Sequence, residues 1–260
     1  VTYTGSDKSD VAAKSDSSDL AKVRASLEAP GTTVEAAWPH LSSPDRHLRF
    51  AARIALEHQP VASWKDKVLS EANPRAALTA LMALARSSGG DKSLQQPILA
   101  ALNKIDFKSL NGIDRVTLIR DYMLAFTRLG EPDATTKAEL ITKLNPLFPT
   151  NDTGLNRDLT ELLVYLGDAG IVAKAAPLVN DSPTQEEQID YARILRFAKT
   201  GWTKELRADY FRWFLRAANY KGGASFDLFI GEIKTDALKT MTEEEKLAIK
   251  DVLDAKPEIK

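Results

Sequence analysis

The spacing of apolar residues is the feature that most constrains this chain. From residue 19 to about residue 253, apolar residues recur at i, i+3, i+4 and i+7, with almost no alternation of period two. Two such stripes are Leu48, Ala51, Ala52, Ala55 and Leu56, and later Leu155, Leu159, Leu162, Leu163 and Leu166. A period near 3.6 places these residues on one face of a helix. The sequence therefore predicts an all-α fold.

Capping residues mark where the helices begin and end. Ser43-Pro44 and Asn73-Pro74 place a capping side chain before a proline, whose missing N–H costs nothing in the first turn. Capping-box spacing occurs at Thr136 with Glu139, at Thr184 with Glu187 and at Thr242 with Glu245. The predicted stops are Gly130, Gly201 and the pair Gly222-Gly223. These start and stop signals predict about a dozen helices of roughly 10–18 residues.

The helices pair at a period that suits stacked hairpins, about 30–40 residues. Residues 45–56 (DRHLRFAARIAL) resemble the second helix of a HEAT repeat, with an Asp near its start, an Arg four residues on and then alanines. The negative charge of Asp45 is stabilised by the positive end of the helix dipole. Arg49 is placed to reach an acidic group in the adjacent repeat. The pattern is weaker at residues 74–86 and 115–129. The predicted fold is a right-handed α-solenoid of degenerate HEAT-like helical hairpins.

The ends of the chain differ from its helical middle. The first eighteen residues are mostly Ser, Asp, Lys and Gly, which are typical of a linker. We therefore expect a linker or the end of a preceding domain at residues 1–18. A HEAT-like helical-repeat domain at residues 19–253 and a tail at residues 254–260 leading to a following domain complete the expected organisation. The chain begins with Val rather than Met, so we expect either that processing has removed a segment or, as the favoured interpretation, that this is a segment of a longer protein.

Composition excludes several classes of function. Lys and Arg number 35 against 36 Asp and Glu, so the formal net charge of −1 gives no positive field to attract nucleic acid. The absence of Cys excludes disulfides, thiol nucleophiles, iron–sulfur clusters and covalently attached c-type haem. No apolar run approaches the roughly 20 residues that span a bilayer. We expect neither a nucleic-acid partner nor insertion into a membrane.

The sequence offers no catalytic or metal site that we can assemble. His40, His47 and His58 form no metal-binding spacing, and we interpret them as solvated or capping residues. The acidic run at residues 243–245 follows Thr242, where acids complement the helix dipole. Ser225 lacks the second glycine of a nucleophile elbow. We expect no catalytic residue, no metal and no cofactor in this chain.

Residues 200–229, which we call the aromatic–arginine segment, are the most unusual stretch. Tyr210, Trp213, Phe214 and Ala217 share one helical face, but Phe211 points elsewhere, so this helix is either packed between neighbours or docked on another domain. Internal packing is the favoured interpretation, and an interaction surface with cation–π stacking is the alternative. The residues of that candidate interaction surface are Arg193, Arg196, Trp202, Arg207, Phe211, Arg212, Trp213, Arg216 and Tyr220.

Four blocks in the second half carry a resemblance to a known family. They lie at residues 155–166 (LNRDL to LVYL), 176–192 (with SPTQEEQI), 199–214 (KTGWT to YFRWF) and 222–230 (GGASF to FI). In this order they resemble the helical segment of large planctomycete and verrucomicrobial multidomain proteins, usually labelled membrane-bound dehydrogenase-like or PVC-type haem-binding proteins. The resemblance covers about residues 155–240 well and, as a degenerate HEAT array, much of the remainder.

The resemblance implies a position between two other domains. In that family the helical segment lies between a sugar-dehydrogenase-like β-propeller and a c-type cytochrome domain, and Val1-Thr2-Tyr3-Thr4-Gly5 would be the exit strand of the propeller. The haem motif CxxCH is absent from this chain, and no catalytic residue of the family maps onto it. An exported, periplasmic or extracytoplasmic location follows from the resemblance alone.

The sequence leaves three functions to weigh. The leading hypothesis is a non-catalytic scaffold that binds neighbouring domains of the same polypeptide or another protein. The alternative is a carbohydrate- or peptide-binding α-solenoid, which exposed Trp202 and Trp213 would favour. An α/α-barrel enzyme would need clustered acids or a His–Tyr pair, which we cannot place in this sequence.

Overall fold

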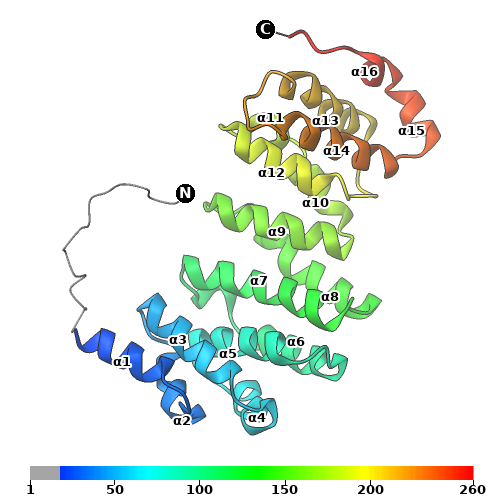
Figure 1. Cartoon of the computed structure of the whole chain (residues 1–260). Helices are drawn as coiled ribbons and strands as arrows, with labels where there is room; N and C mark the ends of the chain where they lie inside the picture. Colours follow the sequence, from blue (N-terminus) through cyan, green and yellow to red (C-terminus); the bar gives the residue numbers. More distant parts are fainter. Residues whose placement is uncertain (1–17, 260) are drawn as a thin grey trace, which may run out of the picture. The chain divides into compact units, whose positions relative to one another are not determined.

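The computed structural model describes residues 18–259 of the chain. The predicted exit strand and most of the predicted linker, within residues 1–17, lie outside the described residues, as does Lys260. Within residues 18–259 all regular secondary structure is helical and no strand is present, so the all-α prediction is confirmed (Figure 1). The chain divides into two compact units, Val1–Ile105 and Asp106–Lys260.

The first unit contains helices α1 to α6. Their bounds are α1 Asp19–Glu28, α2 Val34–Ala37, α3 Arg46–Glu57, α4 Lys65–Leu69, α5 Pro74–Ser87 and α6 Gln95–Lys104. Helix α3 packs against α1 and against α5, and α4 and α6 pack on α5. Ala51, Ala52 and Ala55 of α3 are each at most 4% exposed, and such small side chains let neighbouring helices approach closely.

Arg49, in the HEAT-like pattern of α3, acts locally rather than between repeats. Its Nη1 donates hydrogen bonds to the carbonyl oxygen of Ser43 at 2.6 Å and to that of Pro44 at 3.0 Å. The expected contact with an acidic group of the adjacent repeat is therefore wrong for this arginine. Between α3 and α5 the ion pair runs instead from Arg86 to Glu57, at 2.9 Å.

The second unit contains helices α7 to α16. Their bounds are α7 Gly112–Leu129, α8 Ala134–Leu144, α9 Thr153–Leu166, α10 Ala169–Ala175, α11 Leu178–Asp181, α12 Gln185–Leu195, α13 Lys204–Ala217, α14 Phe226–Lys239, α15 Glu243–Ala248 and α16 Lys250–Asp254. Helices α7, α9 and α12 pack in succession, with α8 and α10 against α9 (Figure 1). Helix α13 packs against α11, α14 and α16. Several helices are shorter than expected, α11 having 4 residues.

Three predicted helix starts are confirmed. The side chain of Asn73 accepts a hydrogen bond from the backbone N–H of Ala76 at the start of α5, and Thr184 does the same for Glu187 at the start of α12. Thr242 and Glu245 form both hydrogen bonds of a capping box at the start of α15.

Two predicted starts are wrong, for one shared reason. At α3 the cap is Asp45 rather than Ser43, and at α8 it is Asp133 rather than Thr136. The Asp45 carboxylate accepts from two backbone N–H groups, those of His47 and Leu48. An ionised carboxylate satisfies the free N–H groups of a first turn better than a hydroxyl.

Of the predicted helix ends, one is confirmed and the others lie beyond the observed ends. Gly130 caps the end of α7 as predicted. Helix α12 ends at Leu195 and α13 at Ala217, each several residues before the predicted Gly201 and Gly222. The left-handed Gly167, with φ of 85°, ends α9 and was not predicted.

The aromatic residues of α13 form part of the core of the second unit. Tyr210, Phe211 and Trp213 are each 1% exposed and Phe214 is 6% exposed. Tyr210 meets Phe211 and Phe214 edge to face, and so does Trp213 with Phe214, whose ring centroids lie 4.9 Å apart. Because α13 has neighbours on several sides, it buries aromatic residues on two faces. The surface alternative is therefore wrong for Phe211, for Trp213 and for Arg207, which is also 1% exposed.

This burial predicts unequal costs for the same truncation. We expect Phe211→Ala to lower the free energy of unfolding by about 3–5 kcal/mol, because it removes a ring from a packed interior. The matched control is Phe197→Ala, which should cost about 1 kcal/mol or less since Phe197 is 54% exposed. Urea unfolding of both variants measures the difference, and equal losses would contradict the core placement.

Candidate functional site

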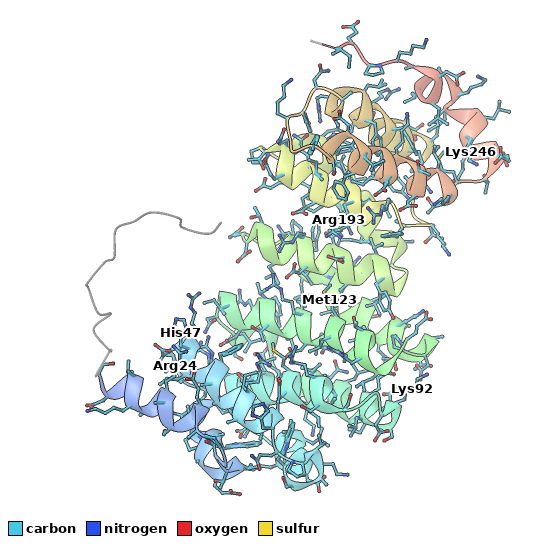
Figure 2. All side chains as sticks on the ribbon, viewed as in Figure 1. Arg24, His47, Lys92, Met123, Arg193 and Lys246 are labelled. Atoms are coloured by element: carbon cyan, nitrogen blue, oxygen red, sulfur yellow. The ribbon has the colours of Figure 1, made fainter. Side chains whose placement is uncertain are left out.

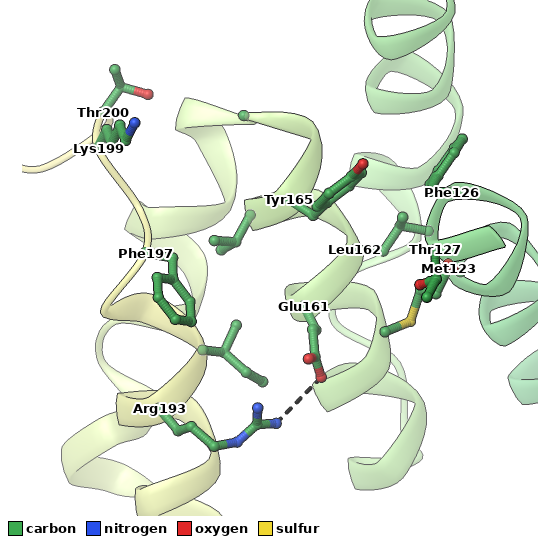
Figure 3. Close-up of a pocket in the computed structure, with 13 residues that line it drawn as sticks. Met123, Phe126, Thr127, Glu161, Leu162, Tyr165, Arg193, Phe197, Lys199 and Thr200 are labelled. Carbon is green, nitrogen blue, oxygen red and sulfur yellow. Dashed lines mark hydrogen bonds and ion pairs between the residues drawn. The ribbon is translucent and has the colours of Figure 1, made fainter. Parts of the chain in front are cut away.

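A hollow in the second unit lies over α9. It has a volume of about 700 Å³ and is lined by residues of α7, α9 and α12 and by the segment that follows α12 (Figure 3). Its lining residues are Met123, Phe126, Thr127, Glu161, Leu162, Val164, Tyr165, Gly167, Arg193, Ile194, Phe197, Lys199 and Thr200. We call this hollow the α9 groove. Figure 2 shows Met123 on α7 and Arg193 on α12, with α9 between the two helices.

Helix α9 forms the floor of the groove because one of its faces is buried and another lies between the neighbouring helices. Its stripe of leucines is buried, with Leu159 and Leu163 fully so. Glu161 and Tyr165 lie off that stripe and one turn apart, so they project between neighbouring helices. Gly167 then ends the helix, and its N–H bonds back to the carbonyl oxygens of Leu163 and Val164.

Aromatic rings form the apolar walls of the groove. Tyr165 stacks on Phe126, with ring centroids 5.7 Å apart and planes 20° from parallel. Phe126 is 4% exposed, whereas Tyr165 is 47% exposed and Phe197 is 54% exposed. Burial raises the pKa of the Tyr165 phenol, and the charge of Glu131 raises it further, so this hydroxyl is neutral at physiological pH. The groove therefore presents two half-exposed rings to solvent.

A chain of ion pairs joins the three helices beside the groove. Asp158 of α9 pairs with Arg120 of α7 at 2.7 Å and with its own neighbour Arg157 at 3.2 Å. Arg157 also pairs with Asp190 of α12 at 3.5 Å. These pairs connect α7 to α9 and α9 to α12.

The series of ion pairs continues into the groove. Arg193 of α12 pairs with Glu161 of α9 at 3.3 Å and with Asp190 at 3.9 Å (Figure 3). We call these six residues, Arg120, Arg157, Asp158, Glu161, Asp190 and Arg193, the ion-pair ladder. Each acid of the ladder has an arginine partner. Lys199 is exposed and, among the charged residues that line the groove, it alone has no ion-pair partner in the described part of the chain.

The lining of the groove carries few titratable groups. Its lining contains one carboxylate, Glu161, and no histidine or hydroxyl–base pair. Among residues 18–259 no cluster of His, Asp or Glu has the geometry to hold a metal ion. A smaller hollow of about 350 Å³ lies beside His58 in the first unit. Within residues 18–259 no helix is both long enough and apolar enough to cross a membrane.

Arg193 is the one residue of the candidate interaction surface that lies in the groove. Its neighbour Arg196 pairs with Asp236 at 3.5 Å and holds its guanidinium 4.5 Å from the ring centroid of Phe197. Arg196 therefore supports a wall of the groove from outside. Arg212 is exposed on α13 and pairs with Asp209 at 2.6 Å.

Trp202 and Arg207 form a separate cluster inside the unit. The Arg207 guanidinium lies 4.3 Å from the Trp202 ring centroid, so the predicted cation–π stacking is present here. Arg207 also donates to the side chain of Thr240 at 3.2 Å and to its carbonyl oxygen at 3.5 Å. Thr240 caps the C-terminus of α14, whose partial negative charge favours a cation. Burial lowers the pKa of Arg207 to about 10, so the group remains charged at neutral pH.

The last three predicted residues gather around Gln188 of α12. Its Oε1 accepts hydrogen bonds from Trp213 Nε1 at 3.1 Å, from Arg216 at 3.3 Å and from the hydroxyl of Tyr220. This polar cluster fastens α13 to α12. The structure thus divides the candidate interaction surface into several small clusters and does not assemble one continuous face.

Sequence reasoning missed the aromatic walls of the groove. Tyr165 and Phe197 are large apolar residues that lie off the buried stripes of their segments, and this position was a readable signal of exposure. Met123 and Phe126 gave no such signal, because their part in the groove depends on which helix packs beside α7.

Comparison with protein-family models, with curated proteins and with solved structures finds no match to this chain. The case for function therefore depends on the geometry of the α9 groove and on the residues themselves.

Two replacements of Arg207 should separate packing from charge. We expect Arg207→Ala to lower the free energy of unfolding by about 3 kcal/mol, because it empties a buried site against Trp202. Arg207→Met keeps most of the volume and removes the buried charge, so it should cost about 1 kcal/mol or less. Chemical denaturation measures both. If the Met variant loses as much as the Ala variant, the charge and not the packing carries the stability.

Gly201 should tolerate no side chain. Its φ is +86°, and a Cβ there would lie 2.1 Å from the carbonyl oxygen of Ala169. We expect Gly201→Ala to lower the free energy of unfolding by about 2 kcal/mol or more. The matched control, Gly223→Ala, should change it by less than about 1 kcal/mol, since no atom lies within 4 Å of its added Cβ. Thermal or urea unfolding of the pair checks the difference, and a stable Gly201 variant would show that the close approach is absent.

Proposed function

We propose that this chain is a non-catalytic helical-repeat module that binds another protein through the α9 groove. The observation that carries this proposal is the pair of half-exposed rings, Tyr165 and Phe197, in one groove of about 700 Å³. Exposed aromatic residues in a concave site are typical of binding surfaces, and Tyr and Arg are enriched among the residues that dominate binding energy. Arg193 supplies the arginine.

The proposal includes the predicted architecture, a right-handed α-solenoid of degenerate HEAT-like hairpins. The support is the successive packing of helices inside each unit, α1 with α3 and α5 in the first and α7 with α9 and α12 in the second. Such stacking is how repeats that cannot bury their apolar faces alone become stable. The HEAT-like pattern at residues 45–56, which spans α3, is the sequence support.

We also propose, on the resemblance alone, that the module joins a dehydrogenase-like β-propeller to a cytochrome c domain in a larger exported protein. The resembling blocks contain residues that touch one another in the fold: Gln188 bonds to Trp213, and Arg157 pairs with Asp190. These contacts give a structural reason for the blocks to occur together.

Carbohydrate binding has less support than protein binding. Stacking on a sugar needs an open aromatic face, but Trp213 is 1% exposed and the Trp202 ring is covered on one side by Arg207. The alternative from the sequence was a solenoid that binds carbohydrate or peptide. Binding of a peptide is compatible with the proposed binding of a protein partner in the groove.

Site-specific crosslinking tests the proposal. With p-benzoyl-phenylalanine at Thr200, which is exposed and lines the groove, we expect one or a few discrete crosslinked proteins in an extract of the source organism. The same crosslinker at Thr235, exposed on α14 outside the groove, is the control. The Thr200 products should disappear when Tyr165→Ala and Phe197→Ala are added. Equal products at both positions, or none at Thr200, would contradict groove binding.

A further inference from the structure

We infer that the occupant of the α9 groove is an acidic amphipathic peptide segment of a partner protein. Its bulky apolar side chains would pack between Tyr165 and Phe197, and its carboxylates would face Lys199. This inference rests on the proposed function and adds the chemistry of the partner to it. Three observations support it. The aromatic walls of the groove are exposed to solvent, the charged residues of the groove are paired except for Lys199 in the part of the chain that the structure describes, and the segment that carries Phe197 and Lys199 is held by buried contacts.

The exposure of the walls favours a peptide over a small molecule. A small-molecule site buries most of the surface of its ligand. Here Tyr165 and Phe197 stand on opposite sides of the hollow, and each keeps about half of its side chain open to solvent (Figure 3). A peptide segment can cover both rings at once, with apolar residues at helical spacing acting as anchors.

The charges favour an acidic segment. The groove lining carries two cations, Arg193 and Lys199, and one anion, Glu161. Arg193 is satisfied by Glu161 and Asp190, so the acids beside the groove are already neutralised. The ammonium of Lys199 is left as the charge that an incoming segment meets. Complementary charge at the rim of an interface selects the partner and speeds its association.

The segment that carries Phe197 and Lys199 is held in place before any partner arrives. Trp202 Nε1 donates to the carbonyl oxygen of Ala198 at 2.9 Å, and Trp202 itself is stacked on Arg207. Gly201 lies tightly against Ala169, at the start of α10. A wall fixed in this way loses little conformational freedom on binding.

Two designed peptides of opposite charge test the inference on the full chain. Both would be labelled amphipathic peptides of about 15 residues with leucines at i, i+3, i+4 and i+7, one with glutamates and one with lysines at the polar positions. At low salt, fluorescence anisotropy should show the glutamate peptide binding about tenfold more tightly than the lysine peptide. Phe197→Ala should weaken binding of the glutamate peptide by about tenfold as well.

Charge reversal supplies the matched variants. Lys199→Glu should abolish or reverse the preference for the glutamate peptide, because it replaces attraction with repulsion. Lys256→Glu, an exposed lysine outside the groove and after α16, should leave the preference unchanged. Equal effects of the two reversals would overturn the role of Lys199, since net charge alone would then explain the preference.

The remaining outcomes separate this inference from the proposed function. If the lysine peptide binds as tightly as the glutamate peptide and its binding is lost in Phe197→Ala, the acidic partner is overturned while groove binding stands. If the glutamate peptide binds but does not respond to Phe197→Ala, the apolar contact is overturned. If neither peptide binds, this partner chemistry is overturned, and crosslinking at Thr200 decides the proposed function independently.

Discussion

The α9 groove depends on the burial of α9 between its neighbours. Helices of this length are marginal on their own in water, so their stability comes from covering the apolar stripe. In α9 that stripe is Leu155, Leu159, Leu162, Leu163 and Leu166, each at most 4% exposed. Because α7 lies on one side and α12 on the other, removing either helix would expose it. The positions of all groove residues follow from this packing.

The same packing explains why charged and aromatic contacts occur side by side. Asp158, Glu161 and Tyr165 follow one another at i, i+3 and i+7 on α9, beside its buried stripe. Each finds a partner on an adjacent helix: Arg120 and Phe126 on α7 and Arg193 on α12. The two acids are neutralised in this way, whereas the tyrosine is covered on one face only. A single row of side chains thus both joins the helices and leaves an open ring.

The sequence predicted what depends on local chemistry. The helical periodicity, the cap at Asn73 and the capping box at Thr242 need only a few neighbouring residues, and all three are present. The core role of Tyr210 and Trp213 was also readable, since a helix with aromatic residues on two faces needs several neighbours. The groove was not readable, because Phe126, Tyr165 and Phe197 come together only when three helices are placed. The choice between two neighbouring capping residues, such as Asp45 and Ser43 at the start of α3, depends on which side chain accepts hydrogen bonds from more backbone N–H groups.

The Trp202–Arg207 pair and the groove are parts of one arrangement. The stacking of Trp202 on Arg207, and the bond from Arg207 to the end of α14, fix the chain just after α12. That stretch of chain carries Phe197 and Lys199, which are both exposed and lie on either side of the buried Ala198. A ring and an ammonium are therefore held at the surface by contacts that are themselves buried. The sequence indicated Trp202 and Arg207 as candidates for a cation–π pair, and this pair positions the residues that we propose contact a partner.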